Sequence, residues 1–232
     1  MEQILDFNYI LDLMSHNYGL AGIFSNPGFG KTTLMMQIID EINKRKDGTT
    51  IVMSNESLSK QRWIEQMQRL NLSTERIIID DASLISHVNI YNQLITHCNI
   101  KKKKISVVCV DSLELLDPAS IRELRRIADK FKVLILVNGM LTRDSGDYAP
   151  ELRPEMYSIG VFRRQIYGYG NQALEYDFLA LLHRKHKCER NIGVARRFDI
   201  QNETELIIKR NWDWNLGSAF IEWDDDAHSF RF

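Results

Sequence analysis

The sequence lacks the excess of basic residues that would attract polyanions over a whole protein surface. Its 30 Lys and Arg residues face 31 Asp and Glu residues, so the formal net charge is −1. Any nucleic-acid site must therefore be a local patch. Residues 101–104 are four consecutive lysines just before a predicted strand. We interpret them as a solvated turn in preference to a DNA patch, because the edge where ligands bind lies at the other end of such strands.

Cysteines and long apolar runs are scarce as well. The three cysteines form no Cys-x-x-Cys pair, which argues against a disulfide framework and is typical of a reducing cytoplasm. Residues 1–20 contain three acidic residues and no apolar block, and no apolar run is long enough to cross a bilayer. We therefore expect a cytoplasmic protein with no signal peptide and no membrane contact.

A single large α/β domain over residues 1–232 is the expected organisation, with two small domains as the alternative. Short apolar runs alternate with segments that carry apolar residues at helical spacing, which favours a mostly parallel sheet with helices on both faces. Three late segments, 203–209, 218–223 and 227–232, are separated by turn residues and predict antiparallel strands at one edge of that sheet.

Residues 20–39, LAGIFSNPGFGKTTLMMQII, predict a phosphate-binding loop. Residues 20–24 are typical of a buried strand, residues 25–30 are rich in turn formers, and residues 31–39 have helical periodicity. Strand, glycine loop, Gly-Lys-Thr and helix is the order of a P-loop, although a strict P-loop has glycine where this chain has Ser25. A chance glycine-rich turn is the weaker interpretation, because both flanking elements are present.

The chemistry of this loop points to ATP and Mg²⁺. Backbone N–H groups at a helix N-terminus bind phosphate, and glycines let the backbone approach closely. Lys31 is placed to reach the terminal phosphates, and the Thr32 hydroxyl to ligate Mg²⁺. The residues predicted to contact the nucleotide are Ser25, Asn26, Pro27, Gly28, Phe29, Gly30, Lys31, Thr32 and Thr33.

Acidic residues follow two other predicted strands, at the edge where parallel sheets bind ligands. Glu56 comes shortly after strand 49–54, and Asp111 directly after strand 105–110. Glu56 is placed either to act as general base for the water that attacks the γ-phosphate or to cap the helix that follows. Asp111 is interpreted as a Walker B aspartate, which binds Mg²⁺ directly or through water. Asn138 ends the predicted strand 133–137, where a polar side chain is placed to sense the γ-phosphate.

Residues 139–172 predict a long loop rich in glycine, proline and tyrosine. A loop of this length in a compact domain is usually functional. Four of its residues combine guanidinium and aromatic groups, which suits phosphate contact and base stacking: Arg163, Arg164, Tyr167 and Tyr169. An ordinary ordered surface loop is an equally good interpretation.

In the order and spacing of its motifs, the chain resembles the C-terminal RecA-like ATPase domain of the bacterial replicative hexameric DNA helicase of the DnaB type. The matching stretches cover nearly all of the chain from about residue 6. They are FSNPGFGKTTL, VMSNESLSKQ, IIIDDASLIS, VVCVDSLELL, LEYDFLALLHR, ELIIKRN and SAFIEWDDDAHSFRF. The resemblance implies a RecA-like P-loop fold, Mg²⁺-dependent ATP hydrolysis, and binding of single-stranded DNA in the channel of a hexamer.

The resemblance also implies roles for individual residues. Lys31 and Thr32 match the Walker A lysine and hydroxyl, Glu56 the catalytic glutamate, and Asp111 the Walker B aspartate. Arg210 matches the arginine finger that reaches the γ-phosphate bound by a neighbouring subunit, a group worth about 10³–10⁵ in rate in related phosphoryl transfers.

The sequence departs from the family at several points. Asn138 and Gly139 replace the Ser-Gln pair that contains the γ-phosphate sensor, and Ile208 replaces a lysine two residues before the finger. The connection between Leu116 and Ile121 is short, and we expect the N-terminal domain and linker helix of the family to be absent. Two functions therefore stay open: a DNA-dependent ATPase of the replicative-helicase class, and a RecA-like ATP-binding accessory or loader protein with weak ATPase activity and no unwinding.

Overall fold

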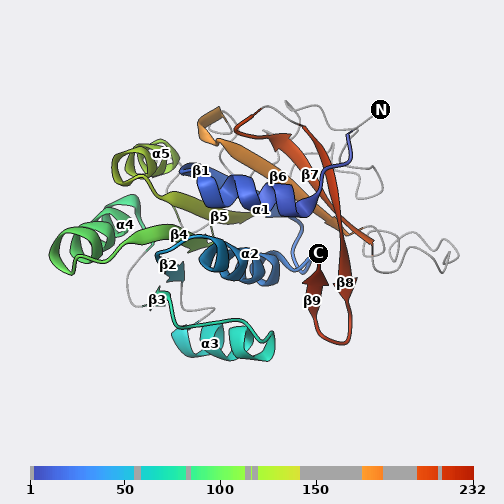
Figure 1. Cartoon of the computed structure of the whole chain (residues 1–232), viewed down its shortest axis with the longest axis horizontal. Helices are drawn as coiled ribbons and strands as arrows, with labels where there is room; N and C mark the ends of the chain where they lie inside the picture. Colours follow the sequence, from blue (N-terminus) through green and yellow to red (C-terminus); the bar gives the residue numbers. More distant parts are fainter. Residues whose placement is uncertain are drawn as a thin grey trace, which may run out of the picture.

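The computed structural model arranges the strands in one nine-stranded sheet with helices on both faces (Figure 1). It describes residues 3–54, 59–81, 85–112, 116, 120–141, 174–184, 203–213 and 216–232. The helices are α1 (Phe7–His16), α2 (Lys31–Arg45), α3 (Lys60–Arg69), α4 (His87–Leu94), the π-helical η2 (Ile95–Ile100) and α5 (Ser120–Phe131). The strands are β1 (Gly19–Ser25), β2 (Thr49–Ser54), β3 (Ile77–Asp80), β4 (Ile105–Asp111), β5 (Leu134–Met140), β6 (Phe178–Arg184), β7 (Glu203–Arg210), β8 (Gly217–Asp224) and β9 (Ser229–Arg231).

The strand order is β3-β2-β4-β5-β1-β6-β7-β8-β9. The pairings from β3 through β6 are parallel, and those from β6 through β9 are antiparallel. The carboxyl ends of β1, β2, β4 and β5 therefore meet at one edge, which is where open α/β sheets bind ligands. This topology confirms the predicted α/β fold with antiparallel strands on one side.

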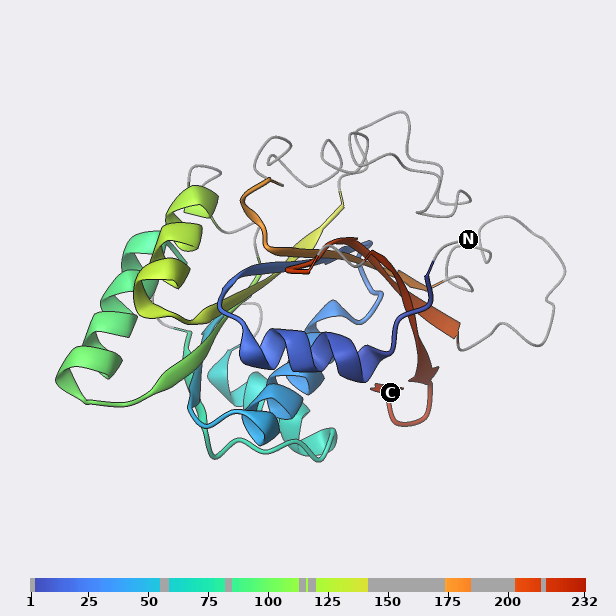
Figure 2. The same ribbon diagram turned by 45° about the horizontal axis from the view of Figure 1, so that its top comes forward.

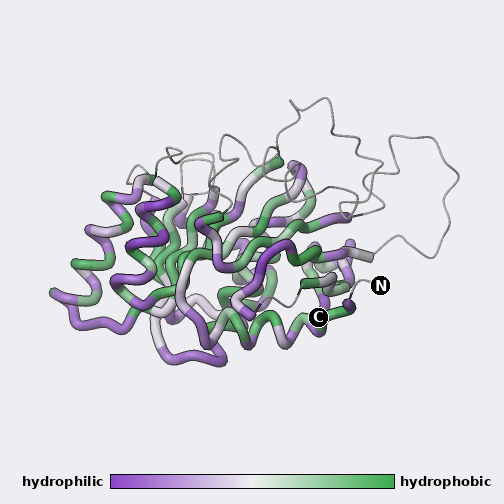
Figure 3. The backbone as a smooth tube through the Cα atoms, turned by 90° about the horizontal axis from the view of Figure 1, so that it is seen from above, coloured by the Kyte–Doolittle hydropathy of each residue, from purple (hydrophilic) through white to green (hydrophobic). Residues whose placement is uncertain are grey.

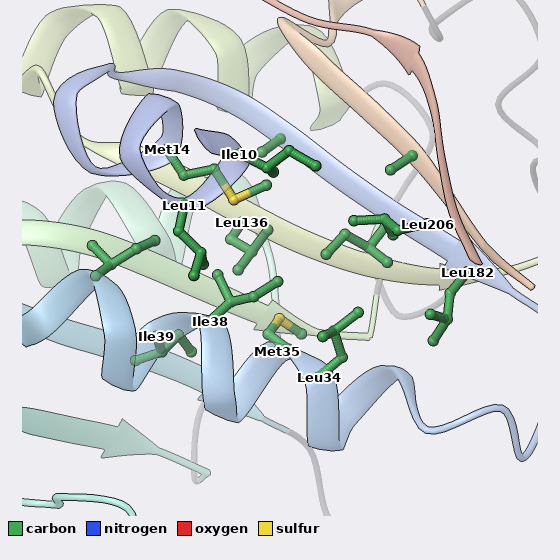
Figure 4. Packing of buried hydrophobic residues seen from close by; sticks show 14 of the residues in the cluster. Ile10, Leu11, Met14, Leu34, Met35, Ile38, Ile39, Leu136, Leu182 and Leu206 are labelled. Atoms are coloured by element: carbon green, nitrogen blue, oxygen red, sulfur yellow. The ribbon is translucent and has the colours of Figure 1, made fainter. Parts of the chain in front are cut away.

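The core has two layers, one on each face of the sheet. Helices α1, α2 and α3 cover one face and α4 and α5 cover the other, as Figure 2 shows. Strand β4 contributes side chains to both layers, because Val107 and Cys109 point into the first and Val108 and Val110 into the second. In the first layer, side chains of α1 and α2 meet Leu136 of β5 (Figure 4). The central strands are accordingly continuous apolar runs and appear as green segments within the fold (Figure 3).

Two predicted elements differ from the structure. The sequence predicts one helix from about Val88 to Cys98, whereas the structure has α4 ending at Leu94 and the π-helical η2 continuing to Ile100. The fifth strand extends beyond Val137 to Met140, because β1 pairs with β5 as far as the Ser25–Met140 pair. A local apolar pattern does not reveal where a neighbouring strand ends, so the sequence did not indicate that residues 138–140 continue the strand.

Candidate nucleotide-binding site

The loop between β1 and α2 has the backbone that close approach to a phosphate requires. Gly28 and Gly30 have φ of +76° and +91°, in the left-handed region that favours glycine. Gly30 is the N-cap of α2, so the first turn of a 15-residue helix begins at Lys31. The N–H groups of that first turn and the positive end of the helix dipole therefore face the loop.

The Lys31 ammonium folds back over this loop. Its Nζ lies 3.4 Å from the Ser25 carbonyl oxygen and 3.3 Å from that of Asn26. The Ser25 hydroxyl, at the position of the missing glycine, is buried and donates to the Asn26 carbonyl at 2.9 Å. Serine is therefore accommodated at this position, with its hydroxyl bonded within the loop.

Thr32 and Asp111 meet across the carboxyl edge of the sheet, as the sequence predicted for a magnesium site. Thr32 Oγ1 lies 3.2 Å from Asp111 Oδ2 and 3.4 Å from Oδ1. Two neighbouring ligands of an octahedral Mg²⁺, each about 2.0–2.1 Å from the ion, stand about 3 Å apart. The hydroxyl and carboxylate thus have the chemistry and the separation that Mg²⁺ requires.

Asn138 supports Asp111 and does not lie at a strand end, contrary to the boundary predicted from the sequence. It is a buried residue within β5, opposite Ile23 of β1. Its Nδ2 donates to Asp111 Oδ1 at 2.6 Å, while its Oδ1 is buried without a hydrogen-bond partner in the described part of the chain. Asn138 therefore holds the orientation of the carboxylate, a role that the strand pattern alone did not indicate.

The thiol next to Asp111 is inert. Burial, and secondly the charge of Asp111, raise the pKa of Cys109 well above its ordinary value. The thiol stays protonated, and it packs at 3.2 Å against the Met35 sulfur in the core. Cys109 is therefore a packing residue beneath the site.

The hairpin of β8 and β9 braces the phosphate loop, a contact that sequence reasoning missed. A methyl group built on Gly30 would stand 3.1 Å from both Phe230 Cζ and Trp223 Cζ3. Gln37 of α2 holds the hairpin through two hydrogen bonds: its Nε2 donates to the Phe230 carbonyl at 2.8 Å, and its Oε1 accepts from the Phe230 N–H at 2.9 Å. The last strand thus packs against both the loop and its helix.

A buried arginine lies behind this hairpin. Arg184 ends β6 and is 1% exposed, and its guanidinium carbon lies 4.1 Å from the centre of the Trp223 ring. Trp223 Nε1 donates to Asp225 Oδ1 at 2.8 Å, and Arg184 Nη2 lies 3.8 Å from the same oxygen. The cation therefore stacks on an aromatic face and reinforces the brace.

Arg210 lies at the opposite end of the parallel strands from the loop. It ends β7 beside Leu179 of β6, and its Nη1 donates to the Leu174 carbonyl at 2.7 Å. Its charge also opposes the burial that raises the pKa of Asp177, whose carboxylate accepts the Leu20 N–H at the start of β1. The structure therefore does not bring Arg210 to the phosphate loop of its own chain.

Several predicted residues lie outside the described part of the chain: Glu56, Arg163, Arg164, Tyr167 and Tyr169. Strand β2, which precedes Glu56, ends at Ser54 in register with Asp111. Over the described ranges there is no cluster of three or more His, Cys, Asp or Glu side chains that could hold a metal. None of the described helices combines the length and apolar character needed to cross a membrane.

Solved structures share the architecture of this chain. No protein-family profile matches the sequence, and no curated protein matches it. One solved ATPase domain superposes with a TM-score of 0.72 at 17% identity, over 91% of this chain and 84% of that one. A DnaB-like replicative helicase, studied with its interactions with primase, gives 0.72 at 17% identity over 96% of this chain and 60% of the helicase chain. The chain therefore has the RecA-like fold of DnaB-type helicase ATPase domains.

Proposed function

We propose that this chain is a Mg²⁺-dependent ATPase of the replicative-helicase class, which couples ATP hydrolysis to the binding of single-stranded DNA. The observation that carries the proposal is the approach of Thr32 Oγ1 to the Asp111 carboxylate at 3.2 Å, at the edge where Lys31 covers the phosphate loop. A chance glycine-rich turn would give no reason for a hydroxyl and a buttressed carboxylate to converge beside it.

Different residues at the nucleotide-binding edge of the sheet are proposed to have different roles. The backbone of residues 28–33 binds the phosphates, and Lys31 places a positive charge against the terminal ones. Thr32 and Asp111 would hold Mg²⁺, which when bound neutralises charge on the phosphate oxygens. Asn138 keeps the Asp111 carboxylate turned toward Thr32. Glu56 is proposed as the base that orients and deprotonates the attacking water.

Arg210 is proposed to act in trans, from one subunit onto the nucleotide of the next. Its position away from the phosphate loop of its own chain supports this, because an arginine that serves a neighbouring subunit must not contact the nucleotide bound by its own subunit. The assembly proposed is a homo-hexamer with single-stranded DNA in its channel.

A specific observation also supports the second candidate, an ATP-binding accessory or loader protein with weak hydrolysis. Asn138 stands where the family carries its γ-phosphate sensor region, and its side-chain amide is already bonded to Asp111. A chain without that sensor would bind nucleotide but respond less to the γ-phosphate, and hence turn over slowly.

The experiment that tests the proposal measures ATP hydrolysis with and without single-stranded DNA, with the oligomeric state determined in the same buffer. We expect Mg²⁺-dependent turnover that DNA stimulates, and loss of turnover in Lys31→Ala. Binding without appreciable turnover, and without a response to DNA, would favour the accessory protein. An unchanged rate in Lys31→Ala would refute both candidates.

A further inference from the structure

Cations gather at the end of the sheet opposite the nucleotide edge, where β2, β3 and β4 begin. We call this group the basic corner and define it by its residues: Lys46, Arg76 and the lysines at 101–104. Lys46 follows α2, Arg76 precedes β3, and residues 101–104 connect η2 to β4. Three stretches that are distant in the sequence thus supply six cations.

Hydrogen bonds between these stretches make the corner one surface. The Thr49 N–H donates to the Lys104 carbonyl at 2.8 Å, and the Thr50 N–H donates to the Arg76 carbonyl at 2.9 Å. The Arg76 guanidinium donates to the carbonyl of Lys46 at 3.4 Å. Burial, and secondly the charge of Lys104, lower the pKa of Lys46, so the two ammonium groups repel each other electrostatically.

The four lysines sit on a fixed turn and not on a loose arm. The Lys101 N–H donates to the Thr96 carbonyl and the Lys103 N–H to the His97 carbonyl, both at 2.9 Å. Lys102 takes the left-handed conformation, with φ of +53°, that reverses the chain into β4. All four lysines are exposed. This fixed presentation was not evident from the run of lysines in the sequence.

The positive charge of the corner is scarcely neutralised. Among the described residues, its one ion pair joins Lys104 and Asp47 at 3.7 Å, with the two side chains 65% and 85% exposed. Such an exposed pair contributes little. Burial, followed by the charges of Lys101 and Lys103, lowers the pKa of His97, which reports the same positive field. Self-repulsion of this kind opposes folding, and a bound polyanion would relieve it.

We propose, on the basis of the function proposed above, that the basic corner binds the phosphate backbone of nucleic acid. This site is separate from the nucleotide edge and from the 139–172 segment. Lysine ammoniums act as point charges toward phosphate. The corner contains no aromatic residue, so it contacts the backbone and not the bases, and binding is independent of sequence. A protein partner fits less well, because an interface needs an apolar centre and only Ile100 is an exposed large apolar residue in stretches 43–50, 74–80 and 95–104.

The test replaces the lysines at 101–104 by glutamine and measures affinity for oligo-thymidine and for a duplex of equal length over a salt series. Four lost phosphate contacts should reduce the slope of log K against log salt by about 3 for single strands, and by about 3 to 4 for duplex. A matched control removes four cations from the surface around α5: Arg122, Arg126, Lys130 and Lys132 to glutamine. The control has the same net charge and should keep the parent slope. ATP hydrolysis without DNA should match the parent in the 101–104 variant, and its thermal unfolding temperature should be equal to or above that of the parent because the repulsion between the lysines is gone.

An unchanged slope in the 101–104 variant, or an equal fall in the control, would overturn the inference. Displacement of DNA by poly-glutamate at equal charge concentration would assign the corner to acidic proteins instead. Failure here is distinct from failure of the proposed ATPase: an unchanged slope with intact, DNA-stimulated hydrolysis rejects only the corner. Conversely, a reduced slope in a chain that hydrolyses no ATP leaves the corner standing and rejects the ATPase.

Discussion

Replacing Gly30 by alanine should strain the phosphate loop in two ways that the structure allows to be counted. The left-handed backbone at φ +91° costs an L-residue about 1–2 kcal/mol. The added methyl group would also meet Phe230 Cζ and Trp223 Cζ3 at 3.1 Å, closer than ordinary carbon contacts. Overpacking of this kind costs about 1–3 kcal/mol, so the free energy of unfolding should fall by about 2–5 kcal/mol in total.

The double variant Gly30→Ala with Phe230→Leu tests the packing contribution. Leucine removes the Phe230 ring atoms that the methyl group meets, so it relieves part of the packing strain, while the contact with Trp223 and the backbone strain remain. Urea unfolding of the parent, both single variants and the double variant gives the coupling between the two positions. We expect the double variant to be more stable than the sum of the single effects predicts, by at least about 0.5 kcal/mol.

Binding of a fluorescent ATP analogue to the same four proteins links this strain to function. Gly30→Ala should weaken binding because its loop cannot keep both the helix cap and the hairpin contact, and Phe230→Leu should restore part of the affinity. If the two unfolding effects add to within about 0.3 kcal/mol and the affinity is not rescued, the hairpin does not brace the loop and the reasoning is wrong.

Three further predictions concern residues proposed to act in catalysis and DNA binding. Glu56→Gln should retain ATP binding and slow hydrolysis by about 10²–10⁴-fold in a steady-state assay, whereas turnover within about threefold of the parent would make Glu56 a helix cap. Mixing Arg210→Ala with Lys31→Ala subunits should restore part of the ATPase activity, and the specific activity of the parent should rise with protein concentration. If mixing restores no activity and the parent shows no concentration dependence, Arg210 has only a structural role. Alanine substitution of four residues in the 139–172 segment should lower the affinity for single-stranded DNA and its salt dependence: Arg163, Arg164, Tyr167 and Tyr169. Unchanged values would show that these residues are not part of the DNA site.

The sequence was sufficient for those parts of the site that are local or that lie at strand ends. The strand, loop and helix around Lys31 are consecutive, so periodicity and turn residues predict them directly. The meeting of Thr32 and Asp111, 79 residues apart, followed from the rule that parallel strands share a carboxyl edge. Contacts that depend on tertiary packing had no such rule. Gln37 and Phe230 are 193 residues apart, and nothing in the local pattern of either position indicates their pairing.

The N-terminal segment illustrates the same limit. The Leu5 N–H donates to the Ser218 carbonyl at 2.9 Å, and the Ser218 N–H donates to the Gln3 carbonyl at 3.0 Å, so residues 3–5 pair alongside β8. A stretch this short has no periodicity of its own. Its conformation is determined by the part of β8 around Ser218, which lies beyond the pairing of β8 with β9 at Glu222–Asp224 and becomes known only once the sheet register is known.

The sheet separates the two ends at which charge gathers, and this separation constrains the role of Arg210. Strand β1 has 7 residues, so its ends are about 20 Å apart at about 3.3 Å per residue. Lys31, Thr32 and Asp111 lie at the carboxyl end. The Arg210 guanidinium is bonded to Leu174 near the amino ends of β1 and β6. The guanidinium is thus directed away from the nucleotide edge of its own chain, and Arg210 either serves a nucleotide held by a second copy of the chain or holds the Leu174 segment in place.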